Sequence, residues 1–531
     1  MGEKVKILVA DDISPLGIEK LEALPGATVR VRTGMTEAEL TEEIRDTDAL
    51  LVRSQTKVTA PVLAAADHLK VIGRAGVGVD NIDIPAATRR GVVVINAPDG
   101  NTISAAEHTF AMLITMSRWI PAADRSIRAG KWDRKSFVGV ELRGKTLAVL
   151  GTGRIGTEVA KRAKVFGMTV LGFDPYLTEA RAKELGITRV SFDEAIAAAN
   201  FITVHTPLTK ETKHMIGTSA FAKMKDGVRI VNCARGGIID EEALAQAIRA
   251  GKVASAAIDV FESEPLASDH PLREFDNVVL TPHLGASTVE AQENVAIDVA
   301  EQVGLLLEGK PFQNAVNLPS LSGELKAFLE PYLGLGEQLG LFAGQWVGES
   351  VSEVEIAFAG PIADHDVSFV TRTVLKGWLG YRYGDEANYV NAPFLAEQAG
   401  IAVREVKQPH SKVFTNLLTL TVRSDKGEHR VAGTLYNGFG PRIVEIDGYT
   451  VDAAPEGKML LTRHTDKPGM IGRIGSILGD AEINIGAMQV GRRETGGEAV
   501  MVLCVDKVIS DDVLTRITDV DGIHLARAVD L

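Results

Sequence analysis

Short apolar segments alternate with amphipathic segments through the N-terminal part of the chain, and this alternation constrains the fold more than any other feature. The apolar segments have the length of strands and occur at residues 6–11, 49–54, 71–74, 146–151, 169–174, 201–206, 228–233 and 256–261. The segments between them, such as Thr36–Arg45 and Glu241–Ala250, have the periodicity of helices. This spacing is typical of βαβ units, whose parallel sheets are covered by helices on both faces. The sequence therefore predicts an α/β fold.

Two longer helical patterns, at residues 104–129 and 288–308, interrupt this rhythm. Each is predicted as one continuous helix that crosses between two lobes. We expect a first, substrate-binding lobe at residues 1–98, completed by residues 290–316, and a second, nucleotide-binding lobe at residues 99–289. Both lobes are predicted to be Rossmann-like or flavodoxin-like, with parallel sheets.

The pattern changes after residue 316. Alternating strands separated by turn residues, with some helix, predict an α+β domain with an antiparallel sheet at residues 317–454. The last segment, residues 455–531, shows the order strand, helix, strand, strand, helix, strand. That order is typical of a ferredoxin-like βαββαβ domain.

The charge and cysteine content exclude several classes of protein. Lys and Arg number 57 against 70 Asp and Glu, a net charge of −13, which argues against nucleic acid or an anionic membrane as the main partner. No apolar run approaches the roughly 18 residues that would span a bilayer. Only Cys233 and Cys504 occur, without a disulfide framework or paired metal-ligand spacing, so we expect a cytoplasmic protein with no metal site.

A glycine-rich turn at residues 151–156 (GTGRIG) follows an apolar strand and opens a helix. In this pattern Gly151 permits the tight turn, Gly153 lets the backbone approach a pyrophosphate, and Gly156 lets the helix pack closely on the strand. The N–H groups at the start of the helix favour an anion. Asp174 ends the next strand, 174 − 153 = 21 residues later. Its carboxylate would bind ribose hydroxyls and repel a 2′-phosphate, which predicts NAD rather than NADP.

Arg235, Glu264 and His283 each follow a predicted strand of the second lobe. Ligands of open α/β sheets bind at the carboxyl ends of the strands, so we expect these side chains to converge. Oxidation of an alcohol needs a base, and histidine is suited to that role near neutral pH. A carboxylate on its other nitrogen fixes the tautomer, and arginine binds a substrate carboxylate through two parallel hydrogen bonds. The three residues therefore predict a dehydrogenase active site.

Further cations and polar groups are predicted around the same cleft. Arg53, Ser54 and Arg74 follow strands of the first lobe, Asn101 begins the first crossover helix, and Lys135, or its neighbour Arg134, follows that helix. So many cations in an acidic chain favour a substrate more anionic than lactate, such as a phosphorylated hydroxy acid.

Four motifs resemble the D-isomer-specific 2-hydroxyacid dehydrogenases over about residues 4–316: GTGRIG, NCARGGIIDEEAL (232–244), DVFESEP (259–265) and TPHLGAST (281–288). The resemblance implies that Arg235 binds the substrate carboxylate and that His283 and Glu264 form the proton relay. It also implies that the backbone of Gly76, Val77 and Gly78 binds the carboxylate. It adds as cofactor-binding residues Arg154, Ile155, His205, Thr206, Pro207, Cys233, Ala234, Asp259 and Gly285.

The C-terminal segments HTDKPGMIGRIGSIL (464–478) and INIGAMQV (483–490) resemble an ACT domain, the module that binds amino acids. In serine-regulated relatives, residues matching Asp466 and Asn484 contact the effector, although Asp466 also fits a simple helix-capping role. The whole arrangement resembles the long-form 3-phosphoglycerate dehydrogenases. That family implies oxidation of 3-phospho-D-glycerate to 3-phosphooxypyruvate with NAD, entry into L-serine biosynthesis, serine feedback, and a homotetramer. It also implies that residues 317–454 are an intervening regulatory domain, where Arg442 is a candidate for a second anion site.

Three alternatives stay open at this point. Another D-2-hydroxyacid dehydrogenase, acting on glyoxylate, hydroxypyruvate or 2-hydroxyglutarate, would share the three catalytic residues but usually lacks the C-terminal 531 − 316 = 215 residues. A non-catalytic NAD-sensing corepressor would be expected to add disordered tails. An amino-acid sensor dominated by the ACT module would not need an intact set of Arg235, Glu264 and His283.

Overall fold

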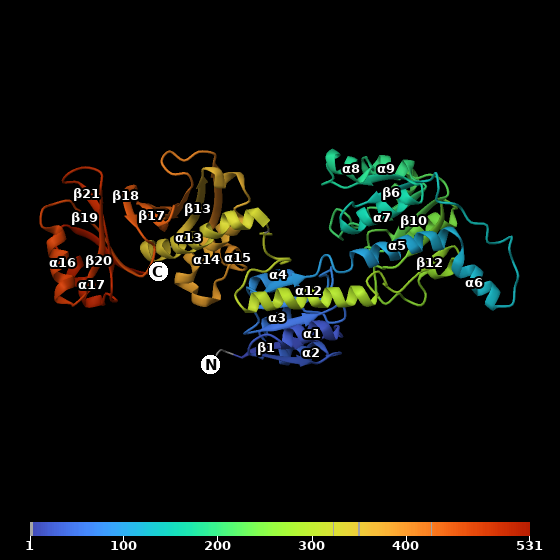
Figure 1. Ribbon diagram of the computed structural model, residues 1–531, viewed down its shortest axis with the longest axis horizontal. Helices are drawn as coiled ribbons and strands as arrows, with labels where there is room; N and C mark the ends of the chain where they lie inside the picture. The colour runs from blue at the N-terminus through green and yellow to red at the C-terminus, as the bar shows by residue number, and fades with distance from the viewer. Residues whose placement is uncertain (1–3, 322, 349–350, 426) are drawn as a thin grey trace.

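The computed structural model describes residues 4–321, 323–348, 351–425 and 427–531, which form four sheets with their helices (Figure 1). The first sheet has the order β2-β1-β3-β4-β5, and all its printed strand pairs are parallel. Its strands and helices are β1 (Val5–Val9), α1 (Pro15–Glu22), β2 (Ala27–Val31), α2 (Glu37–Glu43), β3 (Ala49–Val52), α3 (Ala60–Ala64), β4 (Val71–Arg74), α4 (Ile84–Arg89) and β5 (Val93–Asn96).

Both faces of this first sheet are buried, because alternate strand residues point to opposite sides. Ile7 and Val9 pack with α1 and with α12 (Val289–Leu307), whereas Leu8 packs with α2, α3 and α4. Helix α12 follows the second lobe in the chain, yet it lies along the first lobe (Figure 1). The chain therefore returns to its first lobe, as the helical pattern at 288–308 indicates.

The second sheet has the order β12-β11-β10-β9-β6-β7-β8, again with parallel pairs. Ala148 and Leu150 face one helical layer, and Leu147 and Val149 face the other. Its elements are β6 (Thr146–Leu150), α7 (Arg154–Val165), β7 (Thr169–Phe173), α8 (Glu179–Leu185), β8 (Thr188–Arg189), α9 (Phe192–Ala198), β9 (Phe201–Val204), α10 (Thr218–Lys223), β10 (Val228–Asn232), α11 (Glu241–Arg249), β11 (Val253–Ile258) and β12 (Val278–Leu280).

The predicted continuous helix at 104–129 is wrong. The structure has α5 (Thr102–Ser117) and α6 (Ile120–Arg128) instead. Trp119 between them has a left-handed φ of 57°, and Pro121 lies in the first turn of α6. Proline has no N–H to continue the hydrogen-bond ladder of a helix, so the pattern breaks here and a second helix begins.

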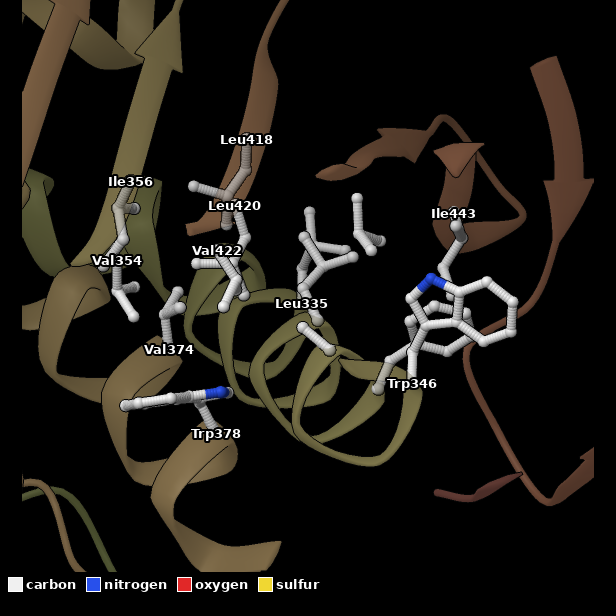
Figure 2. Close-up of a cluster of buried hydrophobic side chains, with 14 of the residues drawn as sticks. Leu335, Trp346, Val354, Ile356, Val374, Trp378, Leu418, Leu420, Val422 and Ile443 are labelled. Atoms are coloured by element: carbon white, nitrogen blue, oxygen red, sulfur yellow. The ribbon is translucent and has the colours of Figure 1, made fainter. Parts of the chain in front are cut away.

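The intervening domain contains a six-stranded sheet of order β14-β13-β15-β16-β17-β18. Strand β14 pairs with β13 in parallel, so the predicted antiparallel sheet is in fact mixed. The elements are α13 (Gly323–Val347), β13 (Val351–Ala359), α14 (Ser368–Tyr383), α15 (Ala392–Gln398), β14 (Ala402–Gln408), β15 (Leu417–Ser424), β16 (Gly427–Tyr436), β17 (Gly440–Ile446) and β18 (Tyr449–Ala453). Figure 2 shows Leu335 and Trp346 of α13 and Val374 of α14 among side chains from the strands.

The C-terminal sheet confirms the ferredoxin-like prediction, with the antiparallel order β20-β21-β19-β22. The elements are β19 (Lys458–Thr465), α16 (Met470–Asp480), β20 (Ile485–Arg492), β21 (Glu498–Val505), α17 (Asp511–Thr518) and β22 (Ile523–Asp530). One hydrophobic cluster contains both α13 residues such as Trp346 and residues of this last sheet, among them Leu461, Val502 and Val529. The last two domains therefore share a core.

The intervening domain also packs on the first lobe. Val390 is buried in the core of that lobe, and the Asn388 side-chain amide donates to the Gly91 carbonyl over 3.1 Å. Within the described residues, no helix is long and apolar enough to cross a membrane. The predicted cytoplasmic location stays a prediction.

Candidate active site

The glycine-rich turn has the geometry of a phosphate-binding loop. Gly151 has a φ of 96°, and a Cβ there would lie 2.5 Å from the His205 carbonyl oxygen. A Cβ at Gly156 would lie 2.0 Å from the carbonyl oxygen of Gly151, so the first turn of α7 touches the strand end. A Cβ added at Gly153, by contrast, would have no described atom within 4 Å. The turn thus leaves open space where a pyrophosphate would approach the N-terminus of α7.

Polar groups with unused hydrogen-bonding capacity lie at the same sheet edge. In the part of the chain that the structure describes, Thr206 Oγ1, Asn101 Oδ1 and Thr102 Oγ1 are buried without a hydrogen-bond partner. Buried polar atoms are rarely left unpaired, so these three atoms suit a polar ligand. Burial lowers the pKa of His205 to about 3, which keeps its ring neutral beside Thr203 Oγ1, 2.9 Å from Nε2. Thr206 and the neutral ring of His205 follow β9, at the strand ends where a dinucleotide would bind, whereas Asn101 and Thr102 begin α5.

Asp174 lies directly beside the turn. Its carboxylate accepts hydrogen bonds from the backbone N–H groups of Thr152 and Tyr176, each over 2.9 Å, and the residue is partly exposed. The acid that follows the second strand of the lobe is therefore aligned with the glycine turn, as its spacing predicts.

Replacing Asp174 with alanine should raise the KM for NAD by about 10- to 100-fold, since a hydrogen bond to a charged group contributes roughly 1.5–3 kcal/mol. It should also reduce the preference for NAD over NADP. Initial rates with each cofactor measure both quantities. Asp193→Ala is the control, because Asp193 is an exposed acid of the same lobe that pairs with Lys223. An unchanged NAD to NADP ratio would refute the role of Asp174.

His283 and Glu264 are in contact. His283 Nδ1 lies 2.8 Å from Glu264 Oε2, and the N–H of Phe261 donates to Glu264 Oε1 over 3.0 Å. Partial burial opposes ionisation of Glu264, but the hydrogen bonds from His283 and Phe261 outweigh it and lower its pKa. The carboxylate is therefore ionised near neutral pH. An Nδ1–H that donates to it makes Nε2 the acceptor nitrogen of a neutral imidazole.

Arg235 lies on the loop next to that of Glu264 and reaches the first lobe. A Cβ at Gly236 would lie 1.9 Å from the Phe261 carbonyl oxygen, so the two loops touch. Arg235 Nε donates to Asp80 of the first lobe over 2.9 Å. A Cβ at Gly78 would lie 1.9 Å from one terminal nitrogen of Arg235. The guanidinium thus contacts the first lobe from the second, against the predicted glycine loop.

Two guanidinium groups, those of Arg74 and Arg235, lie against this loop, and Arg53 lies close enough for its charge to act on Arg74. Arg74 lies over Gly76, where an added Cβ would be 1.6 Å from its NH1, and its buried Nε has no described partner. Burial, together with the positive charges of Arg235 and Arg53, lowers the pKa of Arg74 to about 10. Cations that repel one another in this way are stabilised by a bound anion. The positive charge of this cluster is only partly offset by Asp80 and Asp11, so an anionic ligand would be favoured here.

The remaining predicted ligand-binding residues differ in their surroundings. Ser54, Arg134 and Lys135 are exposed, and Arg154 pairs with Asp99 at 2.6 Å. Burial and the charge of Asp259 raise the pKa of Cys233, so its thiol is protonated. The direct ligand contacts predicted for Ser54, Val77, Lys135, Arg154, Ile155, Pro207, Cys233, Ala234, Asp259 and Gly285 stay predictions.

The sequence analysis missed His108. Its Nε2 lies 3.1 Å from Oδ1 of Asp259, which is fully buried at the end of β11. The available signal is a histidine in the turn of α5 that directly precedes the apolar run at residues 110–114. His108, Cys233 and Asp259 bring ligand-type atoms within 4.8 Å of one another.

The predicted regulatory residues take part in local contacts. Asp466 pairs with Arg492 at 3.0 Å, and the N–H of Asn484 donates to Asp506 over 3.0 Å. Arg442 lies 3.4 Å from Asp452. Their effector and anion contacts stay predictions.

Comparison with known families agrees with this architecture. Residues 110–285 match the NAD binding domain of the D-isomer specific 2-hydroxyacid dehydrogenases. Residues 328–447 match the D-3-phosphoglycerate dehydrogenase intervening domain, and residues 458–522 match the ACT domain. The fold and the family matches thus define an NAD-dependent 2-hydroxyacid dehydrogenase with a C-terminal ACT domain.

Full-length relatives narrow the class. The chain is 48% identical to the D-3-phosphoglycerate dehydrogenase of Archaeoglobus fulgidus over 99% of this chain and 100% of the relative. It is 46% identical to that of Bacillus subtilis over 99% of each. A solved glyoxylate reductase from Paecilomyes thermophila is 31% identical, with a TM-score of 0.56, and covers 60% of this chain and 99% of its own. The chain belongs to the D-3-phosphoglycerate dehydrogenases, a family of NAD-dependent oxidoreductases.

Proposed function

We propose that the protein oxidises 3-phospho-D-glycerate to 3-phosphooxypyruvate, the first step of L-serine biosynthesis. The observation that carries this proposal is the group of Arg53, Arg74 and Arg235 at or near the Gly76–Gly78 loop, next to the His283–Glu264 pair. A substrate with a carboxylate and a phosphate supplies the negative charge that such a site favours. The full-length relatives support the same substrate.

The two lobes have different binding roles in this proposal. We assign substrate binding to residues 1–98 with 290–316, and NAD binding to residues 99–289, where Gly153 and Asp174 would hold the pyrophosphate and the ribose. When bound, NAD supplies the nicotinamide ring that accepts the hydride from the substrate carbon. Residues 317–454 and 455–531 form the regulatory part.

His283 is the general base. Its Nε2 takes the proton of the substrate hydroxyl while the hydride leaves, and Glu264 on Nδ1 stabilises the imidazolium that forms. Arg235 binds the substrate carboxylate with two parallel hydrogen bonds and exchanges its present partner Asp80 for the ligand. The backbone of Gly76, Val77 and Gly78 completes the carboxylate site. Arg53 and Arg74 would bind the phosphate, and the charge that they share with Arg235 supports this assignment.

The formation of reduced cofactor tests this function directly. We expect turnover with 3-phosphoglycerate and NAD to exceed turnover with lactate or 2-hydroxyglutarate by orders of magnitude. Glyoxylate and hydroxypyruvate, tested in the reducing direction, distinguish the rival reductase activities. Faster turnover with any unphosphorylated acid would overturn the substrate assignment.

Serine feedback through the ACT domain is part of the proposal. Asp466 precedes α16 and is held by Arg492, and the family match at 458–522 supports an amino-acid effector here. We expect Asp466→Ala to weaken serine inhibition at least 10-fold and to leave the uninhibited rate within about 2-fold. Inhibition curves with serine measure this, and Asp480→Ala, at the exposed far end of α16, is the control. Unchanged inhibition in Asp466→Ala would exclude this residue as an effector ligand.

The oligomeric state is also proposed from the family. We expect a homotetramer, which sedimentation equilibrium measures.

A further inference from the structure

The carboxylate of Asp259 is surrounded by donors from the chain itself. Oδ1 accepts hydrogen bonds from Thr281 Oγ1 over 2.5 Å and from the N–H of Leu284 over 2.8 Å, and it lies 3.1 Å from His108 Nε2. Oδ2 accepts from the N–H of Gly285 over 3.0 Å. The Asp259 carbonyl also accepts from the N–H of His283 over 2.8 Å. Asp259 therefore fixes both sides of the residue that serves as the base.

The turn that contains His283 needs such support. His283 has a φ of 56°, a left-handed conformation that is unfavourable for a residue with a side chain. Such a conformation persists only where the surroundings determine it. Here the surroundings include the contacts of the 281–285 turn with Asp259 and the bond between His283 and Glu264. The buried carboxylate of Asp259 is therefore one of the groups that hold the turn on which His283 lies.

The other described donors to this carboxylate all belong to residues 281–285, directly after β12. His108 is the one described donor from another part of the chain. It lies on α5, the helix that leads from the first lobe into the second, with 20% of its side chain exposed. Its Nε2 is also 3.4 Å from Thr281 Oγ1. Burial alone would raise the pKa of Asp259, but the hydrogen bonds from His108, Thr281 and Leu284 outweigh it and lower the pKa.

We propose that His108 is a positioning residue for catalysis: its Nε2–H holds Asp259 in the rotamer that fixes the 281–285 turn and thereby places His283. This inference rests on the proposed role of His283 as the base. It gives His108 no contact with the substrate. It assigns to α5, the crossover helix, one of the contacts that orders the active site.

Two substitutions at residue 108 separate this role from a general structural one. His108→Leu removes the donor and should lower kcat about 10- to 100-fold, because small displacements of a reacting group reduce rates on this scale. The KM for 3-phosphoglycerate, whose carboxylate Arg235 would bind from another loop, should change less than about 3-fold. His108→Gln places an amide N–H near the same position and should restore most of kcat. His108 lines a cavity between α5 and β12, and Thr115 of α5 lines it too. Thr115→Val is therefore the control and should retain the parental rate.

A double substitution distinguishes failure of this inference from failure of the proposed function. In a His283→Ala background, His108→Leu should cause little further loss, since both act on the same step. If His283→Ala alone leaves kcat unchanged, the proposed base is wrong. If His283→Ala is impaired and His108→Leu lowers it again by the full factor, the positioning role is wrong. A His108→Leu variant with parental kcat, or a His108→Gln variant as impaired as His108→Leu at equal Tm, would also overturn it.

Discussion

Replacing His283 with alanine is expected to lower kcat about 10³-fold, because a positioned general base contributes roughly 10²- to 10⁴-fold. The affinity for NAD should stay within about 2-fold, since the glycine turn and Asp174 lie elsewhere on the sheet edge. Steady-state rates and fluorescence titration of NAD measure the two quantities. The combination distinguishes loss of a base from loss of the cofactor site.

The chain offers a matched control for this experiment. His214 and Glu262 form a second His–Glu pair in the same lobe, with 2.9 Å between Nε2 and Oε1, and both side chains are partly exposed. His214→Ala should retain the parental rate. Parental turnover in His283→Ala, or equal losses in the two variants, would refute the assignment of His283.

Replacing Arg235 with alanine is expected to lower kcat/KM for 3-phosphoglycerate about 10²- to 10³-fold. Removing one partner of a desolvated charge pair costs about 2–5 kcal/mol, and a substrate carboxylate would lose two hydrogen bonds at once. Lysine should recover only part of the loss, since it has a point charge instead of a planar fork. Initial rates over a range of substrate concentration measure the effect.

The bond between Arg235 and Asp80 requires a separate control. If Arg235 acts only by joining the two lobes, Asp80→Asn should cause the same loss as Arg235→Ala. We expect instead that Asp80→Asn changes kcat/KM only a few-fold, because its carboxylate is 68% exposed and leaves when the substrate binds. Equal losses of kcat/KM in the two variants would mean that Arg235 joins the lobes and does not bind the substrate.

Much of the active site could be predicted because parallel sheets have a simple geometry. The carboxyl ends of all their strands share one edge, so residues that follow successive strands, such as Glu264 and His283, meet without further information. The glycine turn and Asp174 are predictable for the same reason. The βαββαβ order of the C-terminal domain likewise limits its topology to few choices.

Other features depend on contacts that no local pattern encodes. The approach of His108 to Asp259 depends on how α5 packs against β12, and the contact of Arg235 with Asp80 depends on the angle between the lobes. The break at Trp119 depends on a single left-handed residue. The parallel position of β14 beside β13 is decided by long-range packing of α14 and α15.

The shared core of the last two domains affects what proteolytic cleavage between them would release. The connection between β18 and β19 is short, but the apolar faces on either side of it cover each other. Gln345 of α13 and Asp530 of β22 also exchange two hydrogen bonds, of 2.7 and 2.9 Å. A protease that cuts between these strands would therefore release no free fragment. The cleaved C-terminal domain would stay bound to the rest of the protein through this shared core.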